Sequence, residues 1–161
     1  MKNHIENGKK LPFAAKMLAV NSYVRFLDKY PLIKDVEPAH WDFIITIAGI
    51  FTGVVALDRE TISDQKRDMI LDAVTSNGLE IYQRCVEAYE DCSKFVERTH
   101  NGLAGLKEYQ ENPNFLFADS LGSWIVWNLF GHAPENSDER QLVRVLGGLI
   151  AHSFATWWKD V

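Results

Sequence analysis

The sequence between residues 43 and 57 reads FIITIAGIFTGVVAL and contains no charged side chain. At the 3.6-residue period of an α-helix, apolar residues cover almost the whole circumference of this stretch. A helix that is hydrophobic on all sides is buried, either in a protein core or in a lipid bilayer. The clean apolar run is shorter than the roughly 18 residues that a membrane span needs. We therefore interpret it as a core helix over residues 38–57 and expect no membrane span.

Length and composition are those of an ordinary globular domain. The chain has 161 residues, of which 47% are hydrophobic and 24% are charged. A chain of this length buries about two-thirds of its unfolded surface, which is enough for one core without metal or disulfide support. The formal net charge is −5, whereas nucleic acids and anionic membranes attract basic faces. We expect binding to neither.

The cysteines and the N-terminus together predict a cytoplasmic protein. Cys85 and Cys92 are separated by seven residues in a helical pattern, so about 10 Å of helix rise lies between them. That distance is too long for a disulfide, and free thiols fit a reducing compartment. The first residues are polar, with no apolar stretch behind them, unlike a secretory signal.

Helical periodicity continues through the rest of the chain without β-type alternation. Residues 1–11 are polar and predict a flexible lead-in, while Pro12 suits the first turn of an amphipathic helix that ends before Pro31. Further helices are predicted over residues 64–77, 79–99, 115–130 and 138–159, with a short helical turn at 103–109. The predicted fold is all-α: a single compact bundle of five to six helices around residues 38–57, with residues 12–161 forming one domain.

Small residues predict a close contact between two helices. Gly49 and Gly53 are four residues apart on the central helix, and Gly147, Ala151 and Ala155 repeat that spacing on the last helix. Glycine inside a helix costs about 0.5–1 kcal/mol relative to alanine, and close backbone approach is the usual reason for its presence there. We expect these two helices to cross at their small residues.

The glycine face of the central helix also has a functional interpretation. Asp42 and Thr46 share one narrow strip with Gly49 and Gly53, and such a strip could line the wall of a small-ligand pocket. The other candidates for this pocket lie on the last two long helices: Trp124, Trp127 and His152. Simple packing of the glycines against a neighbour is the alternative.

No motif assigns chemistry to the chain. None of the five histidines has another histidine three or four residues away, and no Gly-x-Ser-x-Gly occurs. Cys85 and Cys92 also lack the close spacing of zinc ligands. We assign no catalytic residue, no cofactor and no metal site.

Tryptophan is abundant, with five residues in the chain. Trp157 and Trp158 are adjacent, so they point about 100° apart and cannot both face one core stripe. Because tryptophan is enriched in binding hot spots, we expect Trp158 and Val161 to lie on an apolar patch that contacts another protein or a second copy.

These observations do not identify an activity. The absence of an active-site motif, the acidic balance and the surplus tryptophan favour a non-catalytic, cytoplasmic protein-binding domain, such as an immunity, inhibitor or adaptor protein, with homodimerisation as one form of binding. The alternatives are a helical module that holds a small apolar ligand in its core and a helical enzyme without a recognisable motif.

Overall fold

In a computed structural model, the apolar stretch folds into one helix, α2 (Pro38–Leu57). The structure describes residues 3–77 and 79–159, and for residues 77 and 79–85 it describes the backbone alone. Every residue from Ile44 to Gly53 is buried, which confirms the predicted core helix. α2 is also long and apolar enough to cross a membrane, and 72% of its most apolar window is buried inside the protein. Burial of this kind is typical of a core helix.

All regular elements in the described part of the chain are helical, so the all-α prediction is confirmed. Two short 3-10 helices, η1 (Pro31–Asp35) and η2 (Pro113–Phe115), precede α2 and α6. The remaining α-helices are α1 (His4–Lys29), α3 (Asp64–Asn77), α4 (Leu79–Ala104), α5 (Lys107–Glu111), α6 (Leu116–Phe130) and α7 (Ser137–Phe154).

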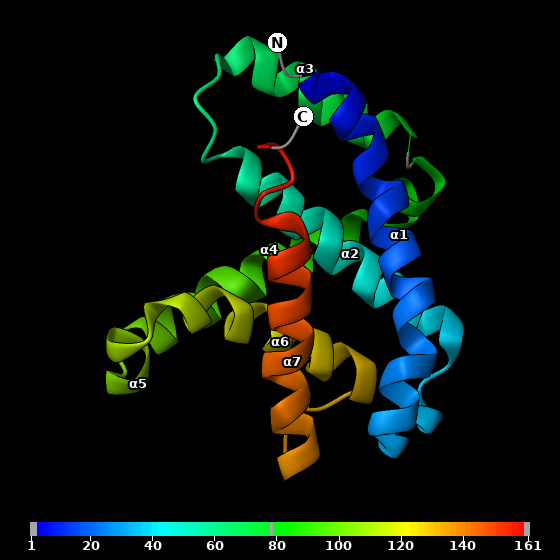
Figure 1. Cartoon of the computed structure of the whole chain (residues 1–161), viewed down its shortest axis with the longest axis vertical. Coiled ribbons are helices and arrows are strands. Elements are labelled where there is room, and N and C mark those ends of the chain that lie inside the picture. Colours follow the sequence, from blue (N-terminus) through cyan, green and yellow to red (C-terminus); the bar gives the residue numbers. More distant parts are fainter. Residues whose placement is uncertain (1–2, 78, 160–161) are drawn as a thin grey trace.

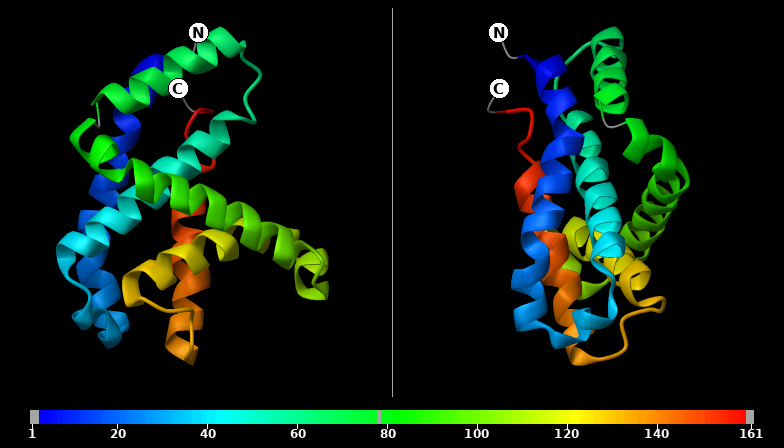
Figure 2. Two further views of the ribbon diagram at one scale, coloured as in Figure 1. Left: turned by 180° about the vertical axis from the view of Figure 1, so that it is seen from behind. Right: turned by 90° about the vertical axis from the view of Figure 1, so that its right-hand side faces the viewer.

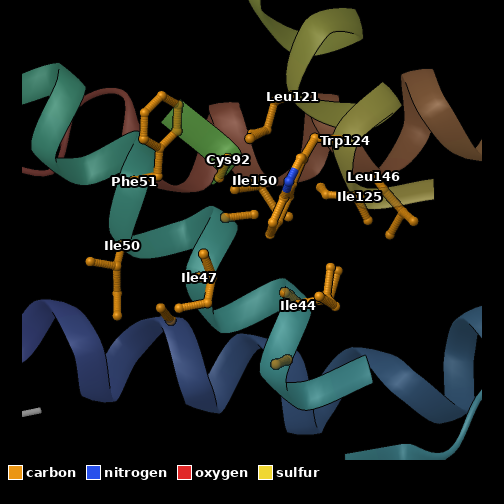
Figure 3. Packing of buried hydrophobic residues seen from close by; sticks show 14 of the residues in the cluster. Ile44, Ile47, Ile50, Phe51, Cys92, Leu121, Trp124, Ile125, Leu146 and Ile150 are labelled. Atoms are coloured by element: carbon orange, nitrogen blue, oxygen red, sulfur yellow. The ribbon is translucent and has the colours of Figure 1, made fainter. Parts of the chain in front are cut away.

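α2 lies between the other long helices (Figure 1) and contacts α1, α4, α6 and α7. In the right-hand view of Figure 2, α1 and α7 lie on one side of α2 and α4 lies on the other. Figure 3 shows the packing from close by: Ile47 and Ile50 point toward α1, whereas Phe51 points away from it. The core therefore surrounds α2 rather than lying along one face of it.

The glycines of α2 bring α1 close. A Cβ added at Gly49 would lie 2.8 Å from the Cβ of Ala15 in α1 and 3.0 Å from the ring of Phe154 in α7. A Cβ added at Gly53 would lie 2.6 Å from a methyl carbon of Leu11 in α1. The small residues of α2 thus mainly accommodate α1.

The glycine of the last helix has a different neighbour from the one predicted. A Cβ added at Gly147 would lie 1.8 Å from the carbonyl oxygen of Ala118 in α6, and one added at Gly122 would lie 1.8 Å from the carbonyl oxygen of Val143 in α7. The prediction that Gly147 marks a crossing with α2 is therefore wrong. The close crossing joins α6 to α7, because both helices present small residues at a spacing of four.

Both ends of the helical region differ from the sequence-based expectation. The flexible lead-in predicted for residues 1–11 is wrong from residue 4 onward, because α1 begins at His4. The side chain of Asn3 accepts a hydrogen bond from the backbone N–H of Glu6 at 3.0 Å and caps this helix. Gly8 then packs on Ile70 of α3, where an added Cβ would lie 3.1 Å from the Ile70 carbonyl oxygen. α7 ends at Phe154, whereas the pattern predicted a helix to residue 159.

Tryptophan side chains tie separate segments together. Four of the five donate their indole N–H to an acceptor elsewhere in the fold, at 2.8–3.1 Å. The donor and acceptor pairs are Trp41 to the Ala19 carbonyl, Trp124 to Asp91, Trp157 to the Asn7 carbonyl and Trp158 to the Gly53 carbonyl. The abundance of tryptophan therefore has a structural use within the chain.

Candidate functional site

A cleft of about 820 Å³ opens where α5, α6 and α7 meet the end of α1. Its polar side chains come from all four helices, and those that carry charge are Lys29, Glu108, Asp119, Arg140 and Arg144. A concave site with convergent polar groups is the usual place to look for function.

Asp119 is the centre of this cleft and is only 4% exposed. Both of its carboxylate oxygens accept from Arg144, at 2.7 and 3.3 Å, and one also accepts from the hydroxyl of Tyr109 at 2.7 Å. Arg144 donates in addition to Glu108 at 3.0 Å, and its guanidinium lies over the ring of Phe115 at 4.4 Å. The cluster joins α5, α6 and α7 at a single point.

The charged and phenolic groups of this cluster are bound to one another. Burial, followed by the hydrogen bond to Asp119, raises the pKa of Tyr109 to about 12, so the phenol stays protonated at neutral pH. Hydrogen bonds to Asp119 and Glu108 raise the pKa of Arg144 above its ordinary value. Ser123 donates its hydroxyl to the Asp119 backbone carbonyl at 2.7 Å. We interpret the cluster as a connection between helices.

Three potential metal ligands meet at the start of α7, although no metal site was predicted from the sequence. The ligand atoms of His132, Glu135 and Glu139 lie within 4.8 Å of one another. Glu139 is buried, and one of its oxygens accepts the backbone N–H groups of Glu135 and Asn136 at 2.9 and 3.2 Å. Its other oxygen lies 3.5 Å from Nε2 of His132. These contacts explain the position of Glu139, which caps the start of α7 and forms an ion pair with His132.

Two Glu-x-x-His sequences, Glu37 to His40 and Glu97 to His100, have a spacing that occurs in di-iron helical bundles. The fold does not combine them: Nε2 of His40 lies 2.6 Å from the carbonyl oxygen of Asn128, and neither histidine joins a group of ligand-like spacing among the described residues. The spacing therefore reflects position on a helix and not a shared site.

The glycine wall predicted for a ligand pocket is filled by protein. Thr46 is buried, and the space in front of Gly49 and Gly53 is taken by side chains of α1 and α7. Asp42 is half-buried; burial raises the pKa of its carboxyl group, and the charge of Lys16 partly offsets this rise. This strip is thus a helix-packing face.

The other three pocket candidates point in different directions. Trp124 is fully buried and donates to Asp91. Trp127 is 45% exposed and packs edge-to-face on Phe95 at 5.8 Å, in a separate groove of about 660 Å³ between α4 and α6. His152 is exposed on α7. Of these three residues only Trp127 lines either of the two clefts described above, and the glycine strip lines neither.

The predicted interface residue Trp158 does not lie on the surface. It is 1% exposed, and its indole N–H donates to the Gly53 carbonyl at 2.8 Å. The prediction of an exposed Trp158 is wrong, because the chain turns after Phe154 and directs this ring into the core, whereas Trp157 is half-buried. Val161, the second predicted interface residue, lies outside the described residues.

Four exposed apolar side chains among the described residues instead form a stripe along α1, which we define as Phe13, Met17, Val20 and Val24. These side chains are 69%, 41%, 46% and 62% exposed, respectively. They are spaced by four, three and four residues, which places them on one side of the helix. α1 lies along the edge of the molecule, and no other helix crosses in front of it in the right-hand view of Figure 2.

The core-facing side of α1 explains why this stripe points outward. Its buried residues are mostly small or short: His4, Gly8, Leu11, Pro12, Ala15, Ala19 and Ser22. Ala15 lies against Gly49, where an added Cβ would be only 2.8 Å from its own Cβ, so a small residue is needed at this contact and the stripe residues face the opposite side of the helix. The 4-3-4 spacing opposite a small-residue face is the sequence signal that could have revealed the stripe.

The chain matches no protein-family model, no curated protein and no solved structure.

Proposed function

We propose that this protein is a non-catalytic protein-binding domain and that the stripe on α1 is its binding surface. The supporting observation is the exposure of four large apolar side chains in one row. Scattered exposed apolar residues are normal, whereas a contiguous patch usually marks an interaction site. Their spacing is that of the a and d positions of a coiled coil, which suits pairing with another helix.

The polar cleft is a weaker candidate for the binding surface than the stripe on α1. Its central carboxylate, Asp119, has protein partners on both oxygens. By contrast, the stripe side chains lie in water, and covering them would be favourable by about 25 cal/mol per Å² of apolar surface removed from solvent.

Site-specific photo-cross-linking in the native cells tests the proposal. p-Benzoylphenylalanine in place of Phe13 should give a light-dependent covalent adduct with a protein. The same group in place of Met69, which is 49% exposed on α3, is the matched control and should give none. Equal labelling at both positions, or no adduct at Phe13, would contradict the proposal.

A further inference from the structure

We infer that the occupant of the stripe is α1 of a second copy of this chain, paired antiparallel about a two-fold axis. This inference rests on the proposed function and adds the identity and orientation of the partner. The symmetry of the stripe and the charges at its two ends support this pairing.

The stripe is self-complementary when one copy is reversed. A two-fold axis between Met17 and Val20 places Met17 opposite Val20 of the second copy and Phe13 opposite its Val24. Each large side chain then faces a smaller β-branched one, which allows the two rows to interdigitate. The isologous geometry closes after two chains, as in most homodimers.

Two charged residues bracket the stripe and select the antiparallel orientation. Lys10 and Asp28 are both exposed, and at 100° per residue both lie about 50° from the midline of the stripe, on the same side. In the antiparallel pair, Lys10 of each copy meets Asp28 of the other, with an offset of one residue. A parallel pair would place the two Lys10 side chains on opposite flanks of the interface, and the two Asp28 side chains likewise, so that Lys10 and Asp28 could not pair across it.

The size of the stripe fits such a dimer. Four large side chains at these exposures present on the order of 400 Å² of apolar surface, comparable to the largest patch on an ordinary monomer. Two copies with their polar margins reach roughly 1,200 Å², where specific interfaces begin. Exposed ion pairs add little affinity, so Lys10 and Asp28 set the orientation and the apolar row supplies most of the binding.

Sedimentation velocity on the purified full chain tests this inference, because a dimer has twice the 18.4 kDa mass of the monomer. Met17→Glu should weaken association at least about a hundredfold, since it places two carboxylates at the centre of the interface. Met69→Glu is the matched control, because Met69 is similarly exposed (49% against 41%) but lies on α3. It should leave the dimer intact, and circular dichroism should show that both variants keep their helix content.

Charge reversal tests the orientation. Lys10→Asp should weaken the dimer about three- to thirtyfold by placing two carboxylates together at each end, and Lys10→Asp with Asp28→Lys should restore it. Lack of restoration overturns the antiparallel pairing. A monomer at every concentration up to roughly 0.2 mM overturns self-association altogether. If cross-linking from position 13 still captures a different protein, the proposed function stands and only the identity of the partner is wrong.

Discussion

The crossing of α6 and α7 makes Gly147→Ala the most informative single substitution for the fold. At this crossing the two backbones approach so closely that each helix presents a glycine to a carbonyl group of the other. The new methyl group would have to lie where the Ala118 carbonyl oxygen is, 1.8 Å from the position of an ideal Cβ. The obstacle is backbone, so no rotamer change removes it.

The expected cost follows from this geometry. Ordinary contacts of a Cβ begin at 3.4 Å, so the helices must separate by about 1.5 Å and lose dispersion contacts along the crossing. Overpacking costs about 1–3 kcal/mol when side chains can adjust. Because backbone must move here, we expect a loss above about 3 kcal/mol, even after alanine recovers its 0.5–1 kcal/mol of helix propensity. For a chain of this size that loss lowers Tm by about 10 °C.

Gly148→Ala is the matched control in the same helix. Nothing lies within 4 Å of a Cβ added at Gly148, so alanine should stabilise the protein by about 0.5–1 kcal/mol. Both variants are compared with the parent chain by urea unfolding and by thermal melting, followed by far-ultraviolet circular dichroism. If Gly147→Ala matches Gly148→Ala in midpoint and Tm, the close crossing does not exist and the reasoning is refuted.

Three further predictions concern individual contacts. Asp119→Ala should cost about 2–3 kcal/mol of folding stability, because it leaves the half-exposed Arg144 without its buried partner. It should also return the pKa of Tyr109 from about 12 toward its ordinary value. An unchanged ultraviolet titration of Tyr109 would contradict the contact between Tyr109 and Asp119. In the folded chain the pKa of His132 is raised, first by its hydrogen bond to the Ala133 carbonyl and then by neighbouring carboxylates. Protonated His132 therefore stabilises the fold fully below pH about 6.5, and this stabilisation is lost as the pH rises through the pKa of His132 in the folded chain. The decline in urea midpoint over that range should be smaller in His132→Gln, and superimposable curves would exclude the effect. Trp158→Phe removes a 2.8 Å hydrogen bond to the Gly53 carbonyl of α2 and replaces the indole with a smaller ring, which should cost about 1–3 kcal/mol. A melting temperature equal to that of the parent would show that this contact does not stabilise the fold.

The sequence alone determined the helices and the core element. α2 could be predicted because an uncharged apolar run needs burial whatever surrounds it. Short-range signals also sufficed at several boundaries: Pro38 occupies the first turn of α2, and Gly131, at φ 79°, ends α6 in the left-handed conformation. These features depend on residues within a few positions of one another.

The partners of the helices were decided only by tertiary structure. Gly147 could be recognised as a contact residue, but nothing within its own helix specifies Ala118 as its neighbour. Asp119 and Arg144 form a bidentate pair across 25 residues, although neither has a local pattern that indicates the other. Such pairs depend on the shapes of two surfaces and not on the properties of one.

The orientation of α1 shows this limit most clearly. Hydrophobicity alone would bury Met17 and Val24 before alanine, yet these two side chains are exposed while Ala15 and Ala19 face the core. Hydrophobicity is a property of each residue, whereas close packing against Gly49 requires a small residue at one position on the opposing helix. Periodicity therefore predicts that α1 is amphipathic, and only the helix it packs against decides which side is inside.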